Sequence, residues 1–420
     1  MREFENDKGH MMFGGMRAEA IADTFGTPVY AVDENIIREN YRKIYDAFAK
    51  HMDTRVYYAC KANSSLAVLK ILEQEGSFAD VLSAGEAMTC IKAGFPASRM
   101  MYTSTCVSNA ELKAITELGI TVNVDSVSEL ERLAKIRTGI EISVRVNPDV
   151  GSGECDKTTT GSKGSKFGIP EHAVISTYRR ASELGLKPIG IHAHIGSGGP
   201  PQAVGPFIET VSILAEMANE VKDECNIDLK MINMGGGIGV PYRPNEPEMD
   251  IEELASSVTE IVTDETSVKT FALEPGRYVV CDSAVLLTRC NDVKDAGIKK
   301  YVCVDAGFNT LIRPAMYGSH HHVAIANKFN KAGEGKYDVV GPICETGDHI
   351  ARDRALPAPD EGDLIAVYNC GAYGFSMSST YNSRPRCREV LVKDGKAELI
   401  RDSETAEDLW RHQTIPERLL

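Results

Sequence analysis

Residues 56–83 read VYYACKANSSLAVLKILEQEGSFADVLS, and this stretch holds two short apolar runs with a helix-like segment between them. The segment has apolar residues at the i, i+3 and i+4 spacing of one helix face, and it ends at Gly76. A strand, a helix and a second strand in this order form the repeating unit of parallel α/β folds.

The same unit recurs along the chain up to about residue 277. Eight apolar or β-branched runs alternate with helix-like segments and predict strands at 56–62, 78–83, 100–104, 121–126, 141–148, 188–197, 229–237 and 270–277. Eight such strands predict a closed (β/α)8 barrel of TIM type, with functional groups at the C-terminal ends of the strands. The competing doubly wound open sheet is disfavoured, because the glycine-rich turn follows the seventh run and lacks G-x-G-x-x-G spacing.

Beyond Tyr278 the pattern changes to strand-like runs without helical segments between them, for example KKYVCVDAG, DLIAVYNCG and REVLVKDGKAELI. These runs predict an antiparallel β domain. The strand-like segment TPVYAVDE at 27–34 precedes the barrel and could pair into the same domain. We therefore expect an α/β barrel over residues 35–279 and a β domain built from residues 1–34 and 280–420.

Composition narrows the class of protein. Of the 420 residues, 43% are hydrophobic and 25% are charged, which is typical of a globular chain. The net charge of −14 argues against nucleic acid or an anionic membrane as a partner. No apolar run reaches the length of a membrane span. The eleven cysteines include no C-x-x-C pair, which favours reduced thiols and a cytoplasmic location.

Unusual polar residues lie where the predicted barrel strands end, namely Lys61, His194, Ser197, Gly235, Gly236, Gly237, Glu274 and Arg277. A lysine at the end of a buried strand is suited to bind a carbonyl group covalently, although a surface lysine is the more common situation. The three glycines let backbone N–H groups approach an anion, or they form only a turn. With a hydroxyl from Ser197 and a guanidinium from Arg277, they would make a phosphate site.

Two further groups allow more than one interpretation. Glu274 could protonate the ring nitrogen of a cofactor, or it could belong to a structural ion pair. His192 and His194 alternate by two and face one side of a strand, which is also a metal-ligand geometry. The run His320, His321 and His322 is a second candidate metal cluster. Neither has a matching set of Cys or Asp, so no metal is expected, and His194 is better suited to pack over a planar cofactor ring.

The predicted β domain contains two more candidate segments. Residues 344–348 read CETGD, where Cys344 is expected to be exposed, although a buried inert cysteine is the more common situation. In LIRPAMYG, Arg313 and Tyr317 are four residues apart. This pair could clamp a substrate carboxylate, or Arg313 could be an ordinary surface arginine.

Taken in order, these motifs resemble those of diaminopimelate decarboxylases, within the alanine-racemase-like class of pyridoxal-phosphate enzymes. The resemblance runs from about Pro28 to Val392 and includes YACKAN, SKFG, HIGSG, the GGG turn, EPGR, RPAMYG, CETGD and AYGFSMSSTYNSRPR. The sequence departs from the family pattern at Thr346, where serine is usual, but no functional group is lost. The Gly/Ser/Thr-rich segment 151–164 carries no prediction.

The resemblance implies a role for each candidate residue. Lys61 would bind pyridoxal 5′-phosphate covalently, His194 would stack on its ring, and Glu274 would pair with the ring nitrogen. Cys344 would return a proton to the substrate. The phosphate would be held by Ser197, Gly235, Gly236, Gly237, Arg277 and Tyr373. The substrate would be held by Arg277, Arg313, Tyr317, Glu345 and Tyr373.

The resemblance also implies a reaction and an assembly. The chain would be a carbon–carbon lyase that converts meso-2,6-diaminopimelate to L-lysine and carbon dioxide, the last step of lysine biosynthesis. It would act as a homodimer in which CETGD of one subunit completes the barrel site of the other. A decarboxylase of ornithine, arginine or lysine is the main alternative. A racemase and a cofactor carrier are less favoured, the latter because such carriers lack the β domain.

Overall fold

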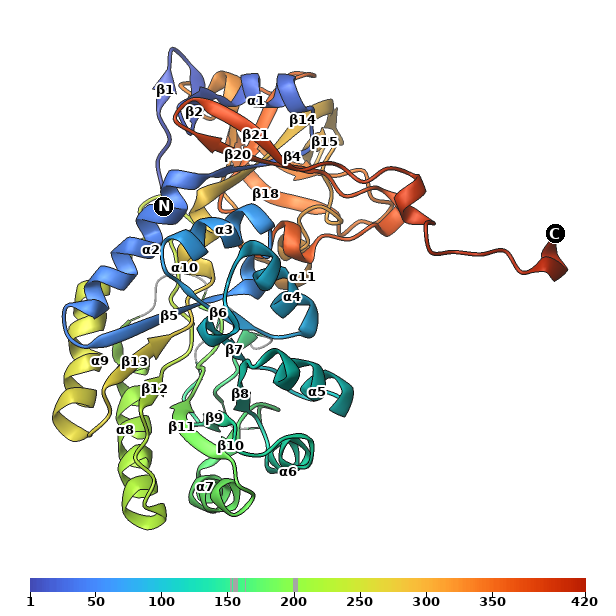
Figure 1. Ribbon diagram of the computed structural model, residues 1–420. Helices are drawn as coiled ribbons and strands as arrows, with labels where there is room; N and C mark the ends of the chain where they lie inside the picture. Colours follow the sequence, from blue (N-terminus) through green and yellow to red (C-terminus); the bar gives the residue numbers. More distant parts are fainter. Residues whose placement is uncertain (152, 154–157, 163, 199–202) are drawn as a thin grey trace. The chain divides into compact units, whose positions relative to one another are not determined.

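The computed structural model describes residues 1–151, 153, 158–162, 164–198 and 203–420, so part of the segment 151–164 lies outside the described residues. The chain divides into two compact units (Figure 1). One unit is made of Ile36–Val280 with Met1, and the other of Arg2–Asn35 and Cys281–Leu420. We call them the barrel unit and the β unit.

Eight parallel strands form the closed barrel that the sequence predicts. Each strand pairs with the next, and the last pairs with the first, so the sheet has no open edge. The strands are β5 (Asp53–Ala59), β6 (Phe78–Val81), β7 (Met100–Tyr102), β8 (Thr121–Val124), β9 (Glu141–Asn147), β11 (Lys187–His192), β12 (Met231–Asn233) and β13 (Thr270–Leu273). The prediction of a (β/α)8 barrel is therefore confirmed. A short strand, β10 (Ile169–Pro170), pairs onto β9 outside the closed ring.

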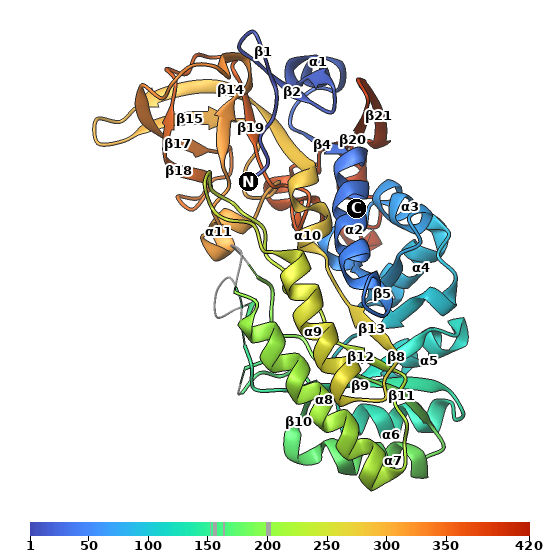
Figure 2. The same cartoon turned by 90° about the vertical axis from the view of Figure 1, so that its left-hand side faces the viewer.

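The helices lie on the outer side of the strands (Figures 1 and 2). They are α2 (Glu34–Ala49), α3 (Leu66–Gln74), α4 (Ala84–Ala93), α5 (Asn109–Leu118), α6 (Val127–Ile136), α7 (Val174–Glu183), α8 (Gly205–Cys225) and α9 (Ile251–Glu265). Three of them start at the same sequence signal, S-x-x-E. The side chains of Ser83, Ser108 and Ser126 accept a hydrogen bond from the backbone N–H three residues later, at the starts of α4, α5 and α6. These caps show how the local sequence sets where each barrel helix begins.

The end of α3 provides a test of barrel stability. The Glu75 carboxylate accepts hydrogen bonds from Arg38 (2.6 Å) and Arg42 (2.6 Å) of α2. Burial alone would raise the pKa of Glu75, but the two arginines outweigh it and hold the pKa below its usual value. This carboxylate therefore stabilises the fold above the ordinary glutamate pKa, and its contribution is lost as pH falls through the lower pKa of the folded state.

We expect Glu75→Gln to lower the free energy of unfolding by about 1 kcal/mol at pH 7, after allowance for the exposure of Arg42. The difference from wild type should shrink in acid, because the wild-type carboxylate also becomes neutral there. Denaturant unfolding at neutral and acidic pH measures both effects. Glu248→Gln is the matched control, since Glu248 pairs with Lys43 in an exposed ion pair. A difference that persists unchanged in acid would contradict the charge-based explanation.

The β unit is built around a mostly antiparallel sheet. Its strands are β4 (Val29–Asp33), β14 (Ala284–Asp295), β15 (Lys300–Val304), β16 (Val323–Ile325), β17 (Gly335–Val340), β18 (His349–Leu356), β19 (Leu364–Val367), β20 (Arg388–Lys393) and β21 (Lys396–Arg401). The pairs β15–β17 and β4–β20 are parallel, which the sequence did not indicate. Strand β4 lies between β14 and β20, so the segment at 27–34 pairs into this sheet as expected.

Strand β18 was missed by the sequence analysis. Its sequence, HIARDRAL, places charged residues at its centre, and its burial alternates irregularly. The strand lies at the edge of the sheet and pairs with β17 alone. An edge strand tolerates charged side chains. The same analysis did not specify the small N-terminal sheet of β1 (Asn6–Asp7), β2 (His10–Phe13) and β3 (Met16–Arg17), whose strands are too short for a pattern.

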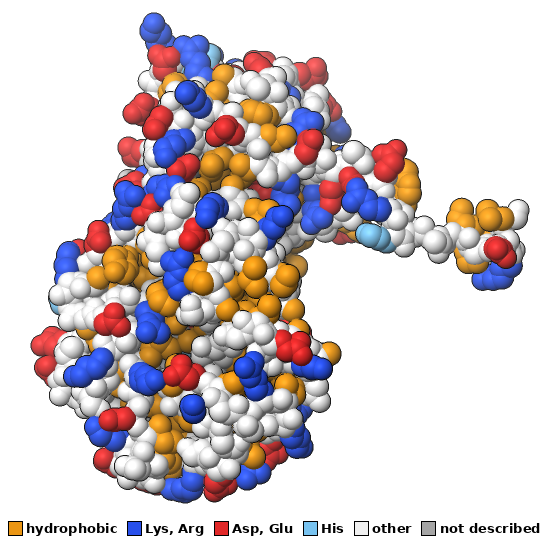
Figure 3. All heavy atoms as spheres, in the orientation of Figure 1, with side chains coloured by type: hydrophobic (Ala, Val, Ile, Leu, Met, Phe, Trp, Pro, Cys, Tyr) orange, Lys and Arg blue, Asp and Glu red, His pale blue; other side chains and the backbone are white. Residues whose placement is uncertain are grey.

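Acidic and basic side chains alternate over the face of the molecule drawn in Figure 3. Among the described helices, none combines the length and the apolar composition needed to cross a membrane.

Candidate active site

Three polar residues close consecutive strands of the barrel. His192 and Asn233 are the last residues of β11 and β12 and are paired in register, and Glu274 follows the end of β13. His192 and Asn233 are fully buried and Glu274 is 3% exposed. Because the strands are parallel, their C-terminal ends bring these three side chains together at one end of the barrel.

The Glu274 carboxylate is held from both sides. His192 Nε2 donates to Oε2 at 3.2 Å, and Asn233 Nδ2 donates to Oε1 at 2.8 Å. Burial alone would raise the pKa of Glu274, but the His192 ring and the nearby Lys61 cation lower it below the usual value. Glu274 is therefore an ionised carboxylate inside the barrel, with its charge available to a cationic group of a ligand.

Lys61 lies just after β5, as predicted, and its side chain is 32% exposed. Its Nζ pairs with Asp80 Oδ2 of β6 at 3.2 Å. Burial and the Glu274 carboxylate raise the pKa of Asp80, while Lys61 opposes that shift. The ion pair with Asp80 thus holds the lysine amine near the barrel end.

His194 contacts the glycine turn. The backbone N–H of Gly236 donates to His194 Nδ1 at 3.2 Å, which places the ring proton on Nε2. Burial, with help from the Lys61 and Arg145 cations, lowers the pKa of His194 well below its usual value. His194 is therefore a neutral imidazole, as a ring that stacks on a planar cofactor would be.

The glycine turn after β12 requires glycine at each position. Gly235 and Gly237 have φ values of 70° and 109°, in the left-handed region. A Cβ on Gly236 would lie 2.4 Å from the carbonyl oxygen of Glu274. The amides of Gly235 and Gly236 donate to Asn233 Oδ1 and His194 Nδ1. Among the described residues, Gly237 is thus the member of the turn best able to donate to an anion.

Arg277 and Ser197, predicted as two parts of one anion site, lie together. Arg277 Nη2 donates to Ser197 Oγ at 2.9 Å, and Nη1 donates to the hydroxyl of Tyr242. Arg277 is 4% exposed, and its guanidinium lies 5.7 Å from the centre of the Tyr242 ring. A buried, oriented guanidinium beside a hydroxyl is suited to bind a phosphate group.

The histidines do not form a metal centre in the part of the chain that the structure describes. No group of three or more His, Cys, Asp or Glu side chains there is arranged to hold a metal. His192 contacts Glu274 instead, and His321 Nδ1 donates to the Tyr368 carbonyl oxygen at 2.8 Å.

In the β unit, Arg313 lies in an aromatic environment. It begins the short helix α11 (Arg313–Tyr317) and is 2% exposed, so it is not the surface arginine of the alternative interpretation. Its Nη2 donates to Ser319 Oγ at 3.1 Å, and its guanidinium lies 5.8 Å and 5.7 Å from the ring centres of Tyr317 and Tyr373. Arg313 and Tyr317, the predicted carboxylate clamp, are thus neighbours, and Tyr373 lies beside Arg313 as well.

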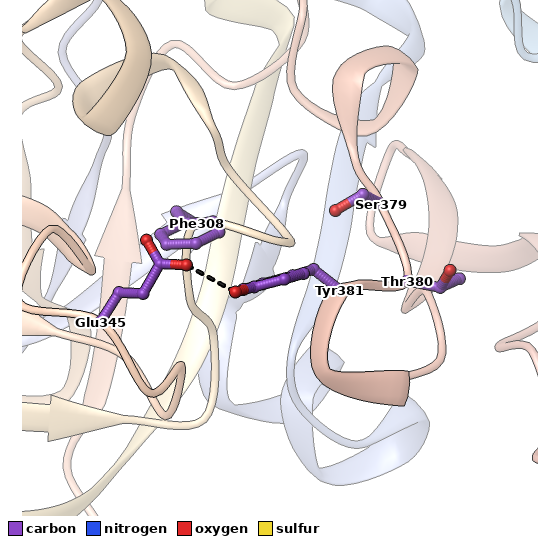
Figure 4. A pocket seen from close by; sticks show the side chains of 5 residues that line it. All are labelled: Phe308, Glu345, Ser379, Thr380 and Tyr381. Carbon is purple, nitrogen blue, oxygen red and sulfur yellow. Dashed lines mark hydrogen bonds between the residues drawn. The ribbon is translucent and has the colours of Figure 1, made fainter.

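The CETGD segment forms a braced, exposed loop. Cys344 and Glu345 are exposed, as expected for Cys344. Figure 4 shows Glu345 beside a pocket of about 520 Å³ that is lined by Phe308, Glu345, Ser379, Thr380 and Tyr381. The Tyr381 hydroxyl donates to Glu345 Oε1 at 2.6 Å. The base of the loop is held by Asp348, whose carboxylate accepts the N–H of Phe308 (2.6 Å) and of Ile343 (2.7 Å).

The sequence analysis missed four residues that contribute to the barrel end, namely Asp80, Arg145, Asn233 and Tyr242. Asp80, Arg145 and Asn233 lie within short strands whose other residues are mostly buried and mostly apolar. A charged or amide side chain inside such a run is a usable signal, because burial of these groups needs a compensating partner. Arg145 also contacts the SKFG motif, since its guanidinium lies 4.5 Å from the centre of the Phe167 ring. No sequence signal marks Tyr242.

Comparisons with known proteins agree with this arrangement. The family model described as "Pyridoxal-dependent decarboxylase, pyridoxal binding domain" matches residues 34–281. Diaminopimelate decarboxylase of Methanothermobacter thermautotrophicus is 48% identical over 423 residues, covering 99% of this chain and 98% of the relative. That of Archaeoglobus fulgidus is 41% identical, covering 99% of this chain and 100% of the relative.

A solved structure is similar over the whole chain. The crystal structure of diaminopimelate decarboxylase from M. jannaschii in complex with L-lysine has a TM-score of 0.92 and 31% sequence identity, and 99% of each chain is covered.

Proposed function

The chain belongs to the diaminopimelate decarboxylases, a family of pyridoxal-dependent decarboxylases, and from this premise we propose that it converts meso-2,6-diaminopimelate to L-lysine and carbon dioxide. The observation that carries the proposal is the barrel end, where the Lys61 cation lowers the pKa of the buried Glu274 carboxylate and the Glu274 backbone is hydrogen-bonded to Gly235 of the glycine turn. A decarboxylase needs such a set, because an amine must hold the cofactor and a carboxylate must keep its ring nitrogen protonated.

The residues at the barrel end fit pyridoxal 5′-phosphate. Glu274 is an anion in a buried place, which suits a protonated ring nitrogen. A Cβ on Gly235 would lie 2.3 Å from the Ala193 carbonyl oxygen, so only glycine fits at this position of the turn. Ser197, Gly237 and Arg277 offer a hydroxyl, an amide and a guanidinium for the phosphate. Lys61 is the half-buried amine of this group.

When bound, the cofactor supplies an electron-accepting ring joined to the substrate nitrogen. Glu274 keeps a proton on the ring nitrogen, and this stabilises the charge that develops as the Cα–carboxylate bond breaks. The neutral His194 ring would pack against the cofactor ring and exclude water from it. Lys61 Nζ would attach the cofactor to the chain. Cys344 Sγ would donate the proton that Cα needs once the carboxylate has left as carbon dioxide.

Residues of the β unit select the substrate in this proposal. Arg313, with Tyr317 and Tyr373 beside it, binds the distal carboxylate, because a buried guanidinium flanked by rings is a fixed two-pronged donor. Glu345 binds the distal ammonium. Arg277 contributes to both the phosphate and the substrate. Ornithine or arginine has no distal carboxylate, so the burial of Arg313 supports diaminopimelate over the alternative substrates.

We also propose a homodimer in which Cys344 and Glu345 act at the barrel site of a second copy. The β domain of residues 1–34 and 280–420, which contains both residues, would form the dimer interface and complete that site. A cytoplasmic location is supported by the described cysteines, which are all free thiols, including Cys60 and Cys90 whose sulfur atoms lie 3.3 Å apart.

The decisive assay is release of carbon dioxide. Purified protein with pyridoxal phosphate is incubated separately with meso-diaminopimelate, ornithine, arginine and lysine. Carbon dioxide from diaminopimelate is expected, with a kcat/KM at least about 100-fold above that for the other three, because only diaminopimelate pairs with Arg313. Equal or faster release from ornithine, arginine or lysine would overturn the substrate assignment. Racemisation of an amino acid without carbon dioxide would overturn the reaction.

A further inference from the structure

Asn233 is a buried amide at the end of β12 that none of the roles above uses. It is fully buried at the end of the barrel where Glu274 and the glycine turn lie. A primary amide with 0% exposure is costly unless both of its polar atoms are hydrogen-bonded. The Nδ2 donor and the Oδ1 acceptor of the amide can each bond to a different partner.

Both ends of the amide are used, and each has a partner of fixed polarity. Asn233 Nδ2 donates to Glu274 Oε1 at 2.8 Å, and Asn233 Oδ1 accepts the N–H of Gly235 at 2.9 Å. An ionised carboxylate can only accept and a backbone N–H can only donate, so the orientation of the amide is determined by its partners. Exchange of its oxygen and nitrogen would break both hydrogen bonds.

The backbone closes the same group into a ring. The N–H of Glu274 donates to the carbonyl oxygen of Gly235 at 2.8 Å. Asn233 thus joins Glu274 and Gly235 through its side chain, while those two residues are joined directly through their backbones. The carboxylate and the first glycine of the turn consequently cannot move independently while the amide is present.

We propose that Asn233 is a positioning residue that fixes the distance between the Glu274 carboxylate and the Gly235–Gly237 turn. The proposal rests on the proposed function, in which those two groups meet the ring nitrogen and the phosphate of one rigid cofactor. A ligand that is bound at both ends gains affinity when the two binding groups are already held at the correct spacing.

The neutrality of the amide is part of the role. A lysine or arginine at this position would also bind Glu274, but its positive charge would compete with the protonated ring nitrogen for the carboxylate. The amide stabilises the ionised form of Glu274 by a hydrogen bond and leaves the net charge in place. His192, which donates to the other oxygen, is the second group in contact with the carboxylate.

Two substitutions separate the two hydrogen bonds. Asn233→Leu removes both. Asn233→Asp keeps an acceptor for the Gly235 N–H but places a second carboxylate beside Glu274, so that the two share a proton and Glu274 loses charge. Asn123→Leu is the matched control. Asn123 is also a buried barrel asparagine, at 1% exposure on β8, and its side chain has no hydrogen-bond partner among the described residues.

The experiment titrates each apoprotein with three ligands and measures dissociation constants from the visible absorbance or the protein fluorescence. The ligands are pyridoxal phosphate, pyridoxal without the phosphate, and 1-deazapyridoxal phosphate, in which carbon replaces the ring nitrogen. Thermal unfolding of each apoprotein is recorded to establish that it is folded. No amino-acid substrate is needed.

Asn233→Leu is expected to weaken pyridoxal phosphate binding by about 10- to 100-fold and to reduce the advantage of pyridoxal phosphate over both analogues. For Asn233→Asp, the ratio of the affinity for pyridoxal phosphate to that for pyridoxal is expected to stay within about twofold of wild type, because the turn is still held. For the same variant, the ratio of the affinity for pyridoxal phosphate to that for the deaza analogue should fall at least about fivefold. Asn123→Leu should leave all three affinities unchanged.

The outcomes separate this proposal from the proposed function. If wild type does not bind pyridoxal phosphate, the cofactor assignment itself fails. If wild type binds it and a folded Asn233→Leu protein shows unchanged ratios between the three ligands, the positioning role is overturned while the function stands. A loss of affinity that is equal for all three ligands would also overturn it, since that is the effect of general structural damage.

Discussion

Replacing Lys61 by alanine is expected to lower kcat by at least about 10³-fold and to abolish the visible absorbance of the lysine-bound cofactor. Lys61 Nζ is placed 3.2 Å from the buried Asp80 carboxylate at the barrel end. Removal of the amine takes away the covalent attachment, so cofactor is held only by its phosphate and its ring nitrogen. Absorbance spectra and carbon dioxide release from diaminopimelate measure the two effects.

The alanine variant also leaves Asp80 buried without its cationic partner, and this could reduce folding stability. Lys61→Arg is therefore the matched control, since it keeps a positive charge for Asp80 but cannot form the covalent link. We expect Lys61→Arg to unfold at nearly the wild-type temperature and to be as inactive as the alanine variant. An unchanged spectrum in either variant would refute the assignment of Lys61.

The shared active site is tested with the same variant. If Cys344 acts at the barrel site of a second copy, mixing inactive Lys61→Ala and Cys344→Ala proteins should restore activity. A hybrid dimer then has one complete site, so random exchange of subunits is expected to restore up to about one quarter of wild-type activity, by the mass action of subunit association. No restoration, despite demonstrated subunit exchange, would count against the shared site.

The second large effect is expected at Arg313. Arg313→Lys should raise the KM for diaminopimelate by about 10- to 100-fold, because an ammonium group cannot replace two parallel guanidinium hydrogen bonds to a carboxylate. The change in kcat should be smaller, since the distal carboxylate does not take part in bond breaking. Lysine retains the positive charge at a site that is 2% exposed, which limits damage to the fold.

Arg388→Lys serves as the control, because Arg388 lies in the β unit and pairs with Asp402 in an exposed ion pair. Steady-state kinetics with diaminopimelate and with lysine as a product inhibitor separate binding from turnover. Lysine, as the product, retains the distal carboxylate and has lost only the one at the reacting carbon, so its inhibition constant should rise together with the KM. An unchanged inhibition constant for lysine would contradict a carboxylate clamp at Arg313.

The barrel could be predicted from the sequence because strand and helix patterns are local. Each of its eight strands is a short apolar run, and helix starts such as Ser83 and Ser126 are marked within four residues. The ends of parallel strands meet at one end of a barrel, so Lys61, His194 and Glu274 could be grouped from their positions alone. Strand β18 was missed because an edge strand tolerates the charges of HIARDRAL.

By itself, the sequence determined the barrel, the residues at its strand ends and the family. Only the tertiary structure decided which of those side chains touch. In the structure, Lys61 donates to Asp80 and Arg277 donates to Tyr242. The two ends of the Asn233 amide bond to Glu274 and Gly235. Such contacts depend on how side chains are oriented on strands that are tens of residues apart in the sequence. A local sequence pattern does not indicate that orientation.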